Sequence, residues 1–289
     1  MTSSQHPGEQ PVGVAGLGLV GSALAARLAG AGFAVLGWDV VAAQREAFAQ
    51  RGGQCADSAA DLARRCPRVV VAVFDADDVT RFVQDAPGLS LVVNCTTADP
   101  ERIEALATQL AAQGVAHVEA PLSGSSEAIR EGSALAFIAG SDADCEAASD
   151  ILAAIAPQRV RVGAAGMGAR AKLASNLVLG LNRAALAEGM AFAQALGIPR
   201  KVFLDIVRDS PAASSAAIAK GEKMVSGDFR PESRIRQHRK DVALMQAFAS
   251  RAQLALPLTE AHARLLDEAI ADGDADLDNA ALIRRWMKK

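Results

Sequence analysis

The stretch Val12-Gly-Val-Ala-Gly-Leu-Gly-Leu-Val-Gly21 places Gly16, Gly18 and Gly21 in GxGxxG spacing. A short β-branched run precedes the glycines and an alanine-rich helical pattern follows them, which predicts a strand-to-helix turn. At such a turn, backbone amides and the helix N-terminus can approach a pyrophosphate without obstruction by a Cβ atom. A glycine turn in any α/β protein is the alternative. The strand, the helix and Ala25 on its inward face favour a dinucleotide site.

The second predicted strand ends at Asp39, about 20 residues past the last glycine, where a carboxylate can accept hydrogen bonds from ribose hydroxyls. That carboxylate would repel a 2′-phosphate, and the next arginine is Arg45. These residues favour NAD over NADP, with a solvated loop aspartate as the alternative. The predicted cofactor contacts here are Gly16, Leu17, Gly18, Leu19, Val20, Gly21 and Asp39.

Outward from this turn, β-branched runs alternate with alanine-rich amphipathic stretches, a pattern typical of βαβ units. The predicted strands are Val12–Ala15, Ala34–Trp38, Val69–Phe74, Leu91–Asn94, Ala116–Glu119, Leu135–Ala139 and Val160–Val162. Ser58 with Asp61, and Asp99 before Pro100, are helix-start signals. Residues 12–165 are therefore predicted to form a doubly wound parallel sheet of the Rossmann type that binds NAD.

After Val162 the strand pattern stops, and an alanine-rich stretch from Gly166 to Leu196 contains no proline, which predicts one long helix. Breaks divide the remainder into further helices, at Gly197–Pro199, Ser210–Pro211, Gly227–Pro231, Pro257 and Gly273. Residues 166–289 are therefore predicted to form an all-helical domain for substrate binding and dimerisation. Met1–Pro11 is polar, lacks the pattern of a secretory signal, and is predicted to be a disordered leader.

Composition narrows the range of partners. The 289 residues carry a formal charge of −3, so no broad basic field would attract nucleic acid or an anionic membrane. No apolar run approaches the roughly 20 residues that span a bilayer. The four scattered cysteines form no CxxC pair, which indicates reduced thiols in a cytoplasmic protein. A small-molecule partner is expected.

Histidine and tyrosine content narrows the chemistry. The four histidines show no HExxH spacing, so no metal site is expected. The chain has no tyrosine, which excludes a dehydrogenase that depends on a Tyr/Lys pair and directs proton transfer toward lysine.

Four segments point to one family: Asn94-Cys-Thr-Thr-Ala-Asp-Pro100, Glu119-Ala-Pro-Leu-Ser-Gly-Ser125, Gly166-Met-Gly-Ala-Arg-Ala-Lys-Leu-Ala-Ser-Asn176 and Ile235-Arg-Gln-His-Arg-Lys-Asp241. With the glycine turn, they resemble the β-hydroxyacid dehydrogenase family, which includes 3-hydroxyisobutyrate dehydrogenase and tartronate semialdehyde reductase and shares a fold with 6-phosphogluconate dehydrogenase. The resemblance covers nearly all of residues 12–289.

The resemblance implies roles for individual residues. Ser123, Gly124 and Ser125 would hold the substrate carboxylate, which suits a hydroxyl beside a glycine turn; an ordinary polar loop is the alternative. Lys172 would exchange a proton with the substrate oxygen and Asn176 would orient that oxygen or the lysine. Their spacing places both side chains on one helical face, in an apolar setting that would favour a neutral lysine.

The resemblance also implies cofactor contacts outside the glycine turn. Thr97 and Lys240 would lie at the nicotinamide end, although a basic helical surface with an incidental ion pair explains Lys240 and Asp241 equally well. Phe74 would touch the cofactor, but Asp75 stands where the family often has proline and puts that contact in doubt.

Three serines depart from the family pattern: Ser125 for the second glycine, Ser175 for asparagine and Ser233 for a phenylalanine that lines the pocket. Together they predict a roomier, more polar substrate site. Arg234 and Arg236 flank Ser233, and either could recognise a second carboxylate, although surface arginines are the commoner case.

The resemblance implies an NAD-dependent oxidoreductase that acts on a small β-hydroxy acid or its semialdehyde, as a homo-oligomer. Imine reduction on the same fold is an alternative, but the lysine position usually holds another residue in that group. A non-catalytic NAD-binding scaffold is a second alternative. Lys172, Asn176 and Ser123 argue against the scaffold.

Overall fold

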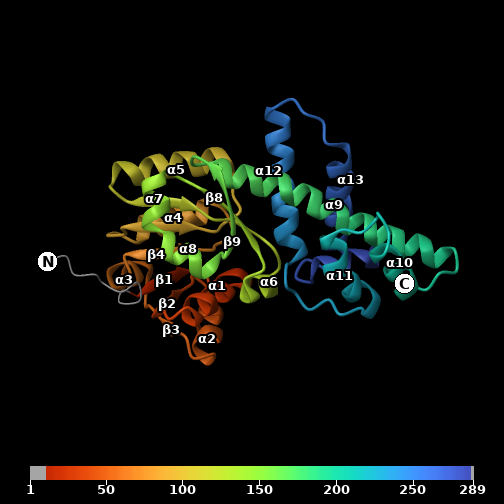
Figure 1. Ribbon diagram of the computed structural model, residues 1–289, viewed down its shortest axis with the longest axis horizontal. Helices are drawn as coiled ribbons and strands as arrows, with labels where there is room; N and C mark the ends of the chain where they lie inside the picture. The colour runs from red at the N-terminus through yellow and green to blue at the C-terminus, as the bar shows by residue number, and fades with distance from the viewer. Residues whose placement is uncertain (1–10, 288–289) are drawn as a thin grey trace. The chain divides into compact units, whose positions relative to one another are not determined.

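The computed structural model describes residues 11–287, so nearly all of the predicted leader Met1–Pro11 lies outside the described residues. Within residues 11–287, nine strands precede the long helix and form one sheet (Figure 1). The strands are β1 (Val12–Ala15), β2 (Val35–Trp38), β3 (Gln54–Cys55), β4 (Arg68–Val71), β5 (Leu91–Asn94), β6 (Ala116–Glu119), β7 (Leu122–Ser123), β8 (Leu135–Ala139) and β9 (Gln158–Gly163).

The sheet has the order β3-β2-β1-β4-β5-β6-β8-β7, with β9 paired to β8. Pairing is parallel from β3 to β6 and between β8 and β9, as the sequence predicts. The β6–β8 and β7–β8 pairs are antiparallel, so the prediction of a wholly parallel sheet was wrong at this edge. The connection from β7 to β8 contains only helix α6 (Ser126–Glu131), shorter than the crossover that a parallel pair requires.

Helices cover both faces of the sheet. Alternate strand residues point to opposite sides, and the apolar residues on both sides are buried. Val12 and Val14 of β1 belong to one buried cluster, whereas Val69 and Val71 of β4 belong to another. The sheet is therefore doubly wound. Its helices are α1 (Leu19–Gly30), α2 (Ala42–Gln50), α3 (Ala59–Arg65), α4 (Ala76–Asp85), α5 (Pro100–Ala112), α6, α7 (Asp142–Ala147) and α8 (Ser149–Ile155).

Both predicted helix starts are confirmed. The Ser58 hydroxyl accepts a hydrogen bond from the Asp61 N–H at 3.0 Å at the start of α3. Asp99 caps α5, with Pro100 at its first position. The predicted strand Val69–Phe74 is too long, because the Val73 N–H donates to the Thr96 hydroxyl at 3.2 Å rather than extending β4.

After β9 the described chain is helical, as predicted. The long helix α9 (Met167–Ala195) matches the predicted span to within one residue at each end. It is followed by α10 (Arg200–Arg208), α11 (Ser215–Ser226), α12 (Ile235–Arg251), α13 (Pro257–Ala271) and the 3₁₀ helix η1 (Asn279–Arg285). The chain divides into two compact units, Met1–Lys172 and Leu173–Lys289, so the division falls inside α9.

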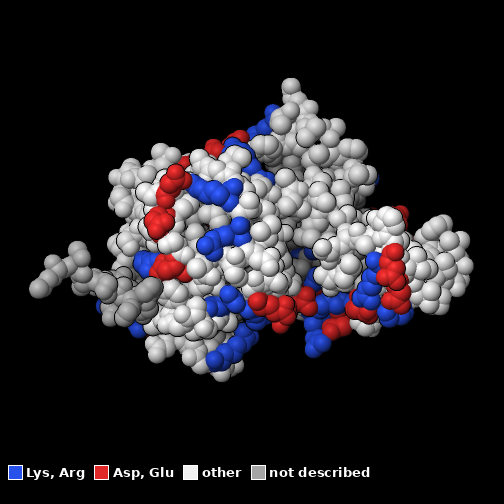
Figure 2. Space-filling view, in the orientation of Figure 1, with Lys and Arg blue, Asp and Glu red and all other residues white. Residues whose placement is uncertain are grey.

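Charged side chains are distributed without a broad basic field on the visible face. Lys and Arg are interspersed with Asp and Glu there (Figure 2), in keeping with the formal charge of −3. Among the described residues, no helix is long and apolar enough to cross a membrane.

Candidate active site

The three glycines of the turn after β1 differ in backbone conformation and in the space that a Cβ atom would have. Gly16 has a φ of +89°, which a residue with a Cβ atom adopts rarely. A Cβ atom on Gly21 would overlap the Gly16 carbonyl oxygen, so α1 packs against the turn only with glycine there. A Cβ atom on Gly18 would meet nothing within 4 Å. The opening above Gly18, at the N-terminus of α1, fits the pyrophosphate of a dinucleotide.

Asp39, just after β2, is buried against this turn. One carboxylate oxygen accepts from the Leu17 N–H at 2.7 Å and the other from the Val41 N–H at 2.8 Å. Asp39 is therefore part of the turn and not the solvated loop residue considered as an alternative. A carboxylate has about four acceptor positions, which leaves capacity for ribose hydroxyls. Arg45 donates to the Asp39 carbonyl oxygen at 2.5 Å, which places a guanidinium group beside the same residue.

The loops that follow β4 and β5 are joined by a hydrogen bond. The Asn94 side-chain oxygen accepts from the Thr96 N–H at 3.0 Å, and Thr96 in turn binds Val73. Phe74 and Thr97 lie in these loops, at the carboxyl ends of neighbouring strands, where ligands bind in doubly wound sheets. Asp75 caps α4 by accepting from the Asp78 N–H at 3.0 Å, a role that proline could not fill.

The segment predicted to hold the substrate carboxylate contains a short strand and a helix start. Ser123 ends β7, and a Cβ atom on Gly124 would lie 2.8 Å from the Ala134 Cβ, so glycine is required by packing. Ser125 caps α6 by accepting from the Ala128 N–H at 3.2 Å. The serine that replaces the family's second glycine thus has a structural role beside its proposed one.

Helix α9 carries the predicted catalytic pair. Lys172 and Asn176 are 6% and 4% exposed. The Asn176 Nδ2 donates to a carboxylate oxygen of Asp241 at 2.9 Å. Because a carboxylate only accepts, this contact orients the Asn176 amide with its nitrogen toward Asp241 and its oxygen away.

Asp241 also links Asn176 to a second predicted residue. Its other carboxylate oxygen lies 3.3 Å from the Lys240 Nζ, so two proposed site residues share one carboxylate. The alternative of an incidental surface ion pair does not fit Asp241, which is 8% exposed. The sequence indicated Asp241 only as the ion-pair partner of Lys240, at the end of the basic run Arg236-Gln-His-Arg-Lys240, and its contact with Asn176 was not predicted.

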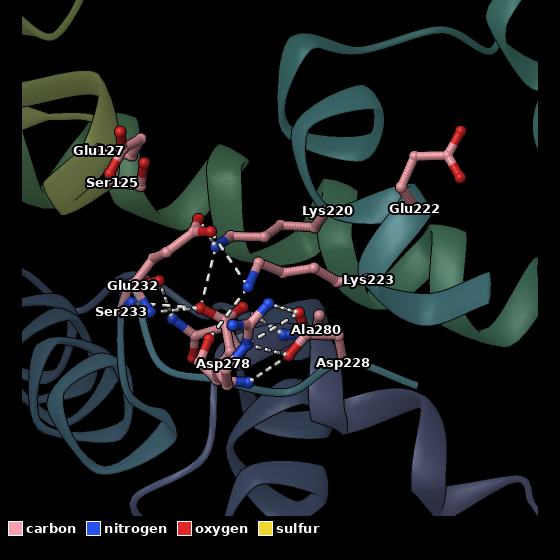
Figure 3. A network of polar contacts seen from close by, with 12 residues as sticks. Ser125, Glu127, Lys220, Glu222, Lys223, Asp228, Glu232, Ser233, Asp278 and Ala280 are labelled. Carbon is pink, nitrogen blue, oxygen red and sulfur yellow. Dashed lines mark hydrogen bonds and ion pairs between the residues drawn. The ribbon is translucent and has the colours of Figure 1, made fainter. Parts of the chain in front are cut away.

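Ser233 precedes α12 and lies in a polar network around Asp278 (Figure 3). One Asp278 carboxylate oxygen accepts from the Lys220 Nζ and the Glu232 N–H, both at 2.9 Å, and from the Ser233 N–H at 3.2 Å. The Ser233 hydroxyl accepts from the Asn279 Nδ2 at 2.9 Å. The segment that carries the predicted pocket residue is therefore held by a fully buried carboxylate, which sequence reasoning did not find.

Arg234 and Arg236 both contact Asp276. The Arg234 Nε lies 3.6 Å from one carboxylate oxygen, and Arg236 binds the other. Their positive charges are compensated within the helical unit, which favours the structural interpretation of this arginine pair over recognition of a second substrate carboxylate.

Two family models together match residues 11–286. The model for the NAD binding domain of 6-phosphogluconate dehydrogenase matches residues 11–166, and the model described as NAD-binding of NADP-dependent 3-hydroxyisobutyrate dehydrogenase matches residues 166–286. An L-threonate dehydrogenase from Cupriavidus necator is 31% identical over 94% of this chain and 95% of its own length.

The chain belongs to the β-hydroxyacid dehydrogenase family.

Solved structures and other relatives agree with this assignment. A 3-hydroxyisobutyrate dehydrogenase from Salmonella typhimurium superimposes with a TM-score of 0.86 and 27% identity, over 96% of this chain and 100% of that one. The cytokine-like nuclear factor N-PAC of Xenopus tropicalis is 27% identical over 97% of this chain but only 54% of its own length. A sequence similar to this whole chain therefore makes up about half of the longer N-PAC protein.

Proposed function

We propose that this member of the β-hydroxyacid dehydrogenase family oxidises the CH–OH group of a small β-hydroxy acid with NAD, or reduces the corresponding semialdehyde. The observation that carries the proposal is the arrangement on α9, where a buried lysine lies one turn before an asparagine fixed by a buried carboxylate. The names of relatives that act on L-threonate and 3-hydroxyisobutyrate support the same class of substrate.

In this mechanism, Lys172 accepts the hydroxyl proton as the alcohol is oxidised, and returns it in the reverse direction. Asn176, with the amide orientation that Asp241 imposes, orients the reacting hydroxyl or the lysine. Ser123, with Gly124 and Ser125, binds the carboxylate, so that the acid is held at two points. The nicotinamide cofactor, when bound, supplies the hydride acceptor. Gly16–Gly21, Asp39, Phe74, Thr97 and Lys240 are the residues proposed to hold it.

The direct test is a turnover assay. Purified protein is incubated with NAD or NADP and one of three acids, 3-hydroxyisobutyrate, glycerate or L-threonate, and absorbance of the reduced cofactor is followed. We expect turnover with at least one acid, and turnover lower by about 100-fold or more when Lys172 is replaced by methionine. An undiminished rate in the Lys172→Met variant would contradict the proposed role of the lysine.

A non-catalytic NAD-binding scaffold is the second candidate, because N-PAC relatives match 97% of this chain. It predicts binding of reduced cofactor without turnover of any acid. Fluorescence of bound NADH measured on the same preparation separates the two functions.

We further propose that NAD is preferred over NADP, since the Asp39 carboxylate would repel a 2′-phosphate. Arg45, which binds the Asp39 backbone, is the group that could compensate for that repulsion. We expect kcat/KM with NAD to exceed that with NADP by about tenfold or more, and Asp39→Asn to narrow the difference. A higher kcat/KM with NADP in the unmodified protein would contradict the preference.

A further inference from the structure

Glu119, the last residue of β6, is a buried acid that the mechanism above does not use. It is 2% exposed. Its two carboxylate oxygens accept hydrogen bonds from the backbone N–H groups of Gly166 and Ala169, the second at 2.7 Å. The first N–H groups of a helix have no partner within the helix, and α9 begins at Met167. Glu119 therefore caps α9 from a neighbouring strand.

The two glycines at the start of α9 fit this contact. Gly166 has a φ of +88°, a conformation that favours glycine. A Cβ atom on Gly168 would lie 2.8 Å from the Glu119 Cβ and 2.9 Å from its Oε2, closer than ordinary contact allows. Burial raises the pKa of Glu119, and the hydrogen bonds from Gly166 and Ala169 partly offset that rise.

The capped turn leads directly to Lys172. Gly168 and Lys172 are four residues apart, so they lie on the same face of α9. On its other side, Glu119 is followed at once by Ala120–Ser125, the segment proposed to bind the substrate carboxylate. One side chain thus connects the start of that segment to the helix turn before the proposed proton-transfer residue.

We propose that Glu119 is a positioning residue, which holds the first turn of α9, and with it Lys172, in place relative to the segment Ala120–Ser125. Its importance for turnover rests on the proposed function. A misplacement of about 1 Å in a reacting group can cost about 100-fold in rate, so a modest loosening of this turn is enough to slow the reaction.

The test compares Glu119→Gln with a matched control, Glu104→Gln. Glutamine keeps the size of the side chain but turns an NH₂ group toward one of the two backbone donors. Glu104 also approaches the start of α9, but it binds the Arg170 side chain instead of backbone amides. We expect Glu119→Gln to lower kcat by about 10-fold to 100-fold while KM for the acid and the affinity for NADH change less than about threefold. Glu104→Gln is expected to stay within about twofold of the unmodified protein.

Hydrogen exchange followed by mass spectrometry gives a readout that needs no substrate. Peptides that cover residues 164–172 should exchange faster in Glu119→Gln and unchanged in Glu104→Gln, with the rest of the chain protected as before. If Glu119→Gln fails to fold, Glu119→Asp, which keeps both acceptor oxygens on a shorter side chain, is measured instead with the same expectation.

Unchanged exchange at residues 164–172, or an unchanged kcat with faster exchange, would overturn the positioning role. Failure of the proposed function would appear in the unmodified protein, as no turnover of any of the three acids. In that case the hydrogen-exchange rates of Glu119→Gln and Glu104→Gln still decide whether Glu119 holds the start of α9.

Discussion

At the scale of single residues, substitution of Lys172 tests the proposed proton transfer most directly. We expect Lys172→Met, which keeps the volume of the side chain but removes the amine, to lower kcat by about 100-fold or more, the contribution typical of general acid–base catalysis. Affinity for NADH should remain nearly unchanged. Steady-state kinetics and NADH fluorescence titration measure the two quantities.

Lys201→Met is the matched control, because Lys201 is 53% exposed and pairs with Asp205 on the surface of α10. A parallel loss of kcat and cofactor affinity in Lys172→Met would indicate a lysine that supports the structure rather than the reaction.

At the scale of elements, the glycine turn allows two substitutions in one motif to be compared. Gly21→Ala should lower the Tm by about 10 °C or more, because the new methyl group would overlap the Gly16 carbonyl oxygen. Gly18→Ala should lower the Tm by only a few degrees, about 1 kcal/mol for a poorer N-cap, while weakening NADH binding at the open side of the turn.

Thermal denaturation and NADH titration of both variants check this comparison. Equal destabilisation by the two substitutions would show that the glycines are not specialised in this way.

The elements also show how far the sequence predicts this fold. Hydrophobic period and helix-start residues predicted seven of the strands, the long helix and the helical remainder, because these signals are local. The two-residue strands β3 and β7 were missed, since two residues show no period. The antiparallel direction of β8 depends on the length of its connection and on its partners, which no local pattern encodes.

The candidate site was predictable to a different degree. Glycine spacing and family motifs indicated Asp39, Lys172 and Asn176 as candidate site residues, but not the long-range contacts that hold parts of the candidate site in place. Asp241 orients Asn176 from a position 65 residues further along the chain, and Asp278 fixes the segment of Ser233 from 45 residues away. Such long-range contacts depend on tertiary packing, which a single sequence does not reveal.

At the scale of the whole molecule, buried histidines predict sensitivity to acid. Burial lowers the pKa of His117 and of His262 from 6.5 to about 4. Each histidine is therefore neutral in the folded protein but protonated in the unfolded chain between these pH values. Stability is retained above pH 6.5 and lost as the pH falls toward 4, by about 2 kcal/mol for each histidine between pH 7.5 and pH 5.

Urea denaturation at pH 7.5 and pH 5 measures this loss. His117→Gln and His262→Gln should each flatten the pH dependence, one in each compact unit. An equally steep dependence in both variants would assign the acid sensitivity to other groups.

We also propose that the protein self-associates through its helical unit. Phe192 near the end of α9 and Leu196, the first residue after it, are 66% and 63% exposed. Val202 and Ile206 form a similar pair on α10, 48% and 51% exposed. Exposed apolar side chains at this spacing, at the end of α9 and on α10, form a surface that a second copy of the chain could cover.

Light scattering coupled to size-exclusion chromatography should give a dimer or larger assembly for the unmodified protein. The double change Phe192→Glu and Leu196→Glu is expected to shift the mass toward the monomer, whereas Leu258→Glu, at a side chain 68% exposed on α13, should not. A monomer in the unmodified protein would exclude the proposal.

The hydrogen bond between Asp39 and the glycine turn has a consequence for how a dinucleotide binds and leaves. Two backbone amides are already fixed by this carboxylate, so the turn has its shape before a dinucleotide arrives. A preorganised site loses little conformational entropy on association, and release does not require the backbone to rearrange. A dehydrogenase releases its reduced cofactor and binds an oxidised one in every turnover. A preorganised binding site therefore suits a dissociating co-substrate better than a permanently bound group.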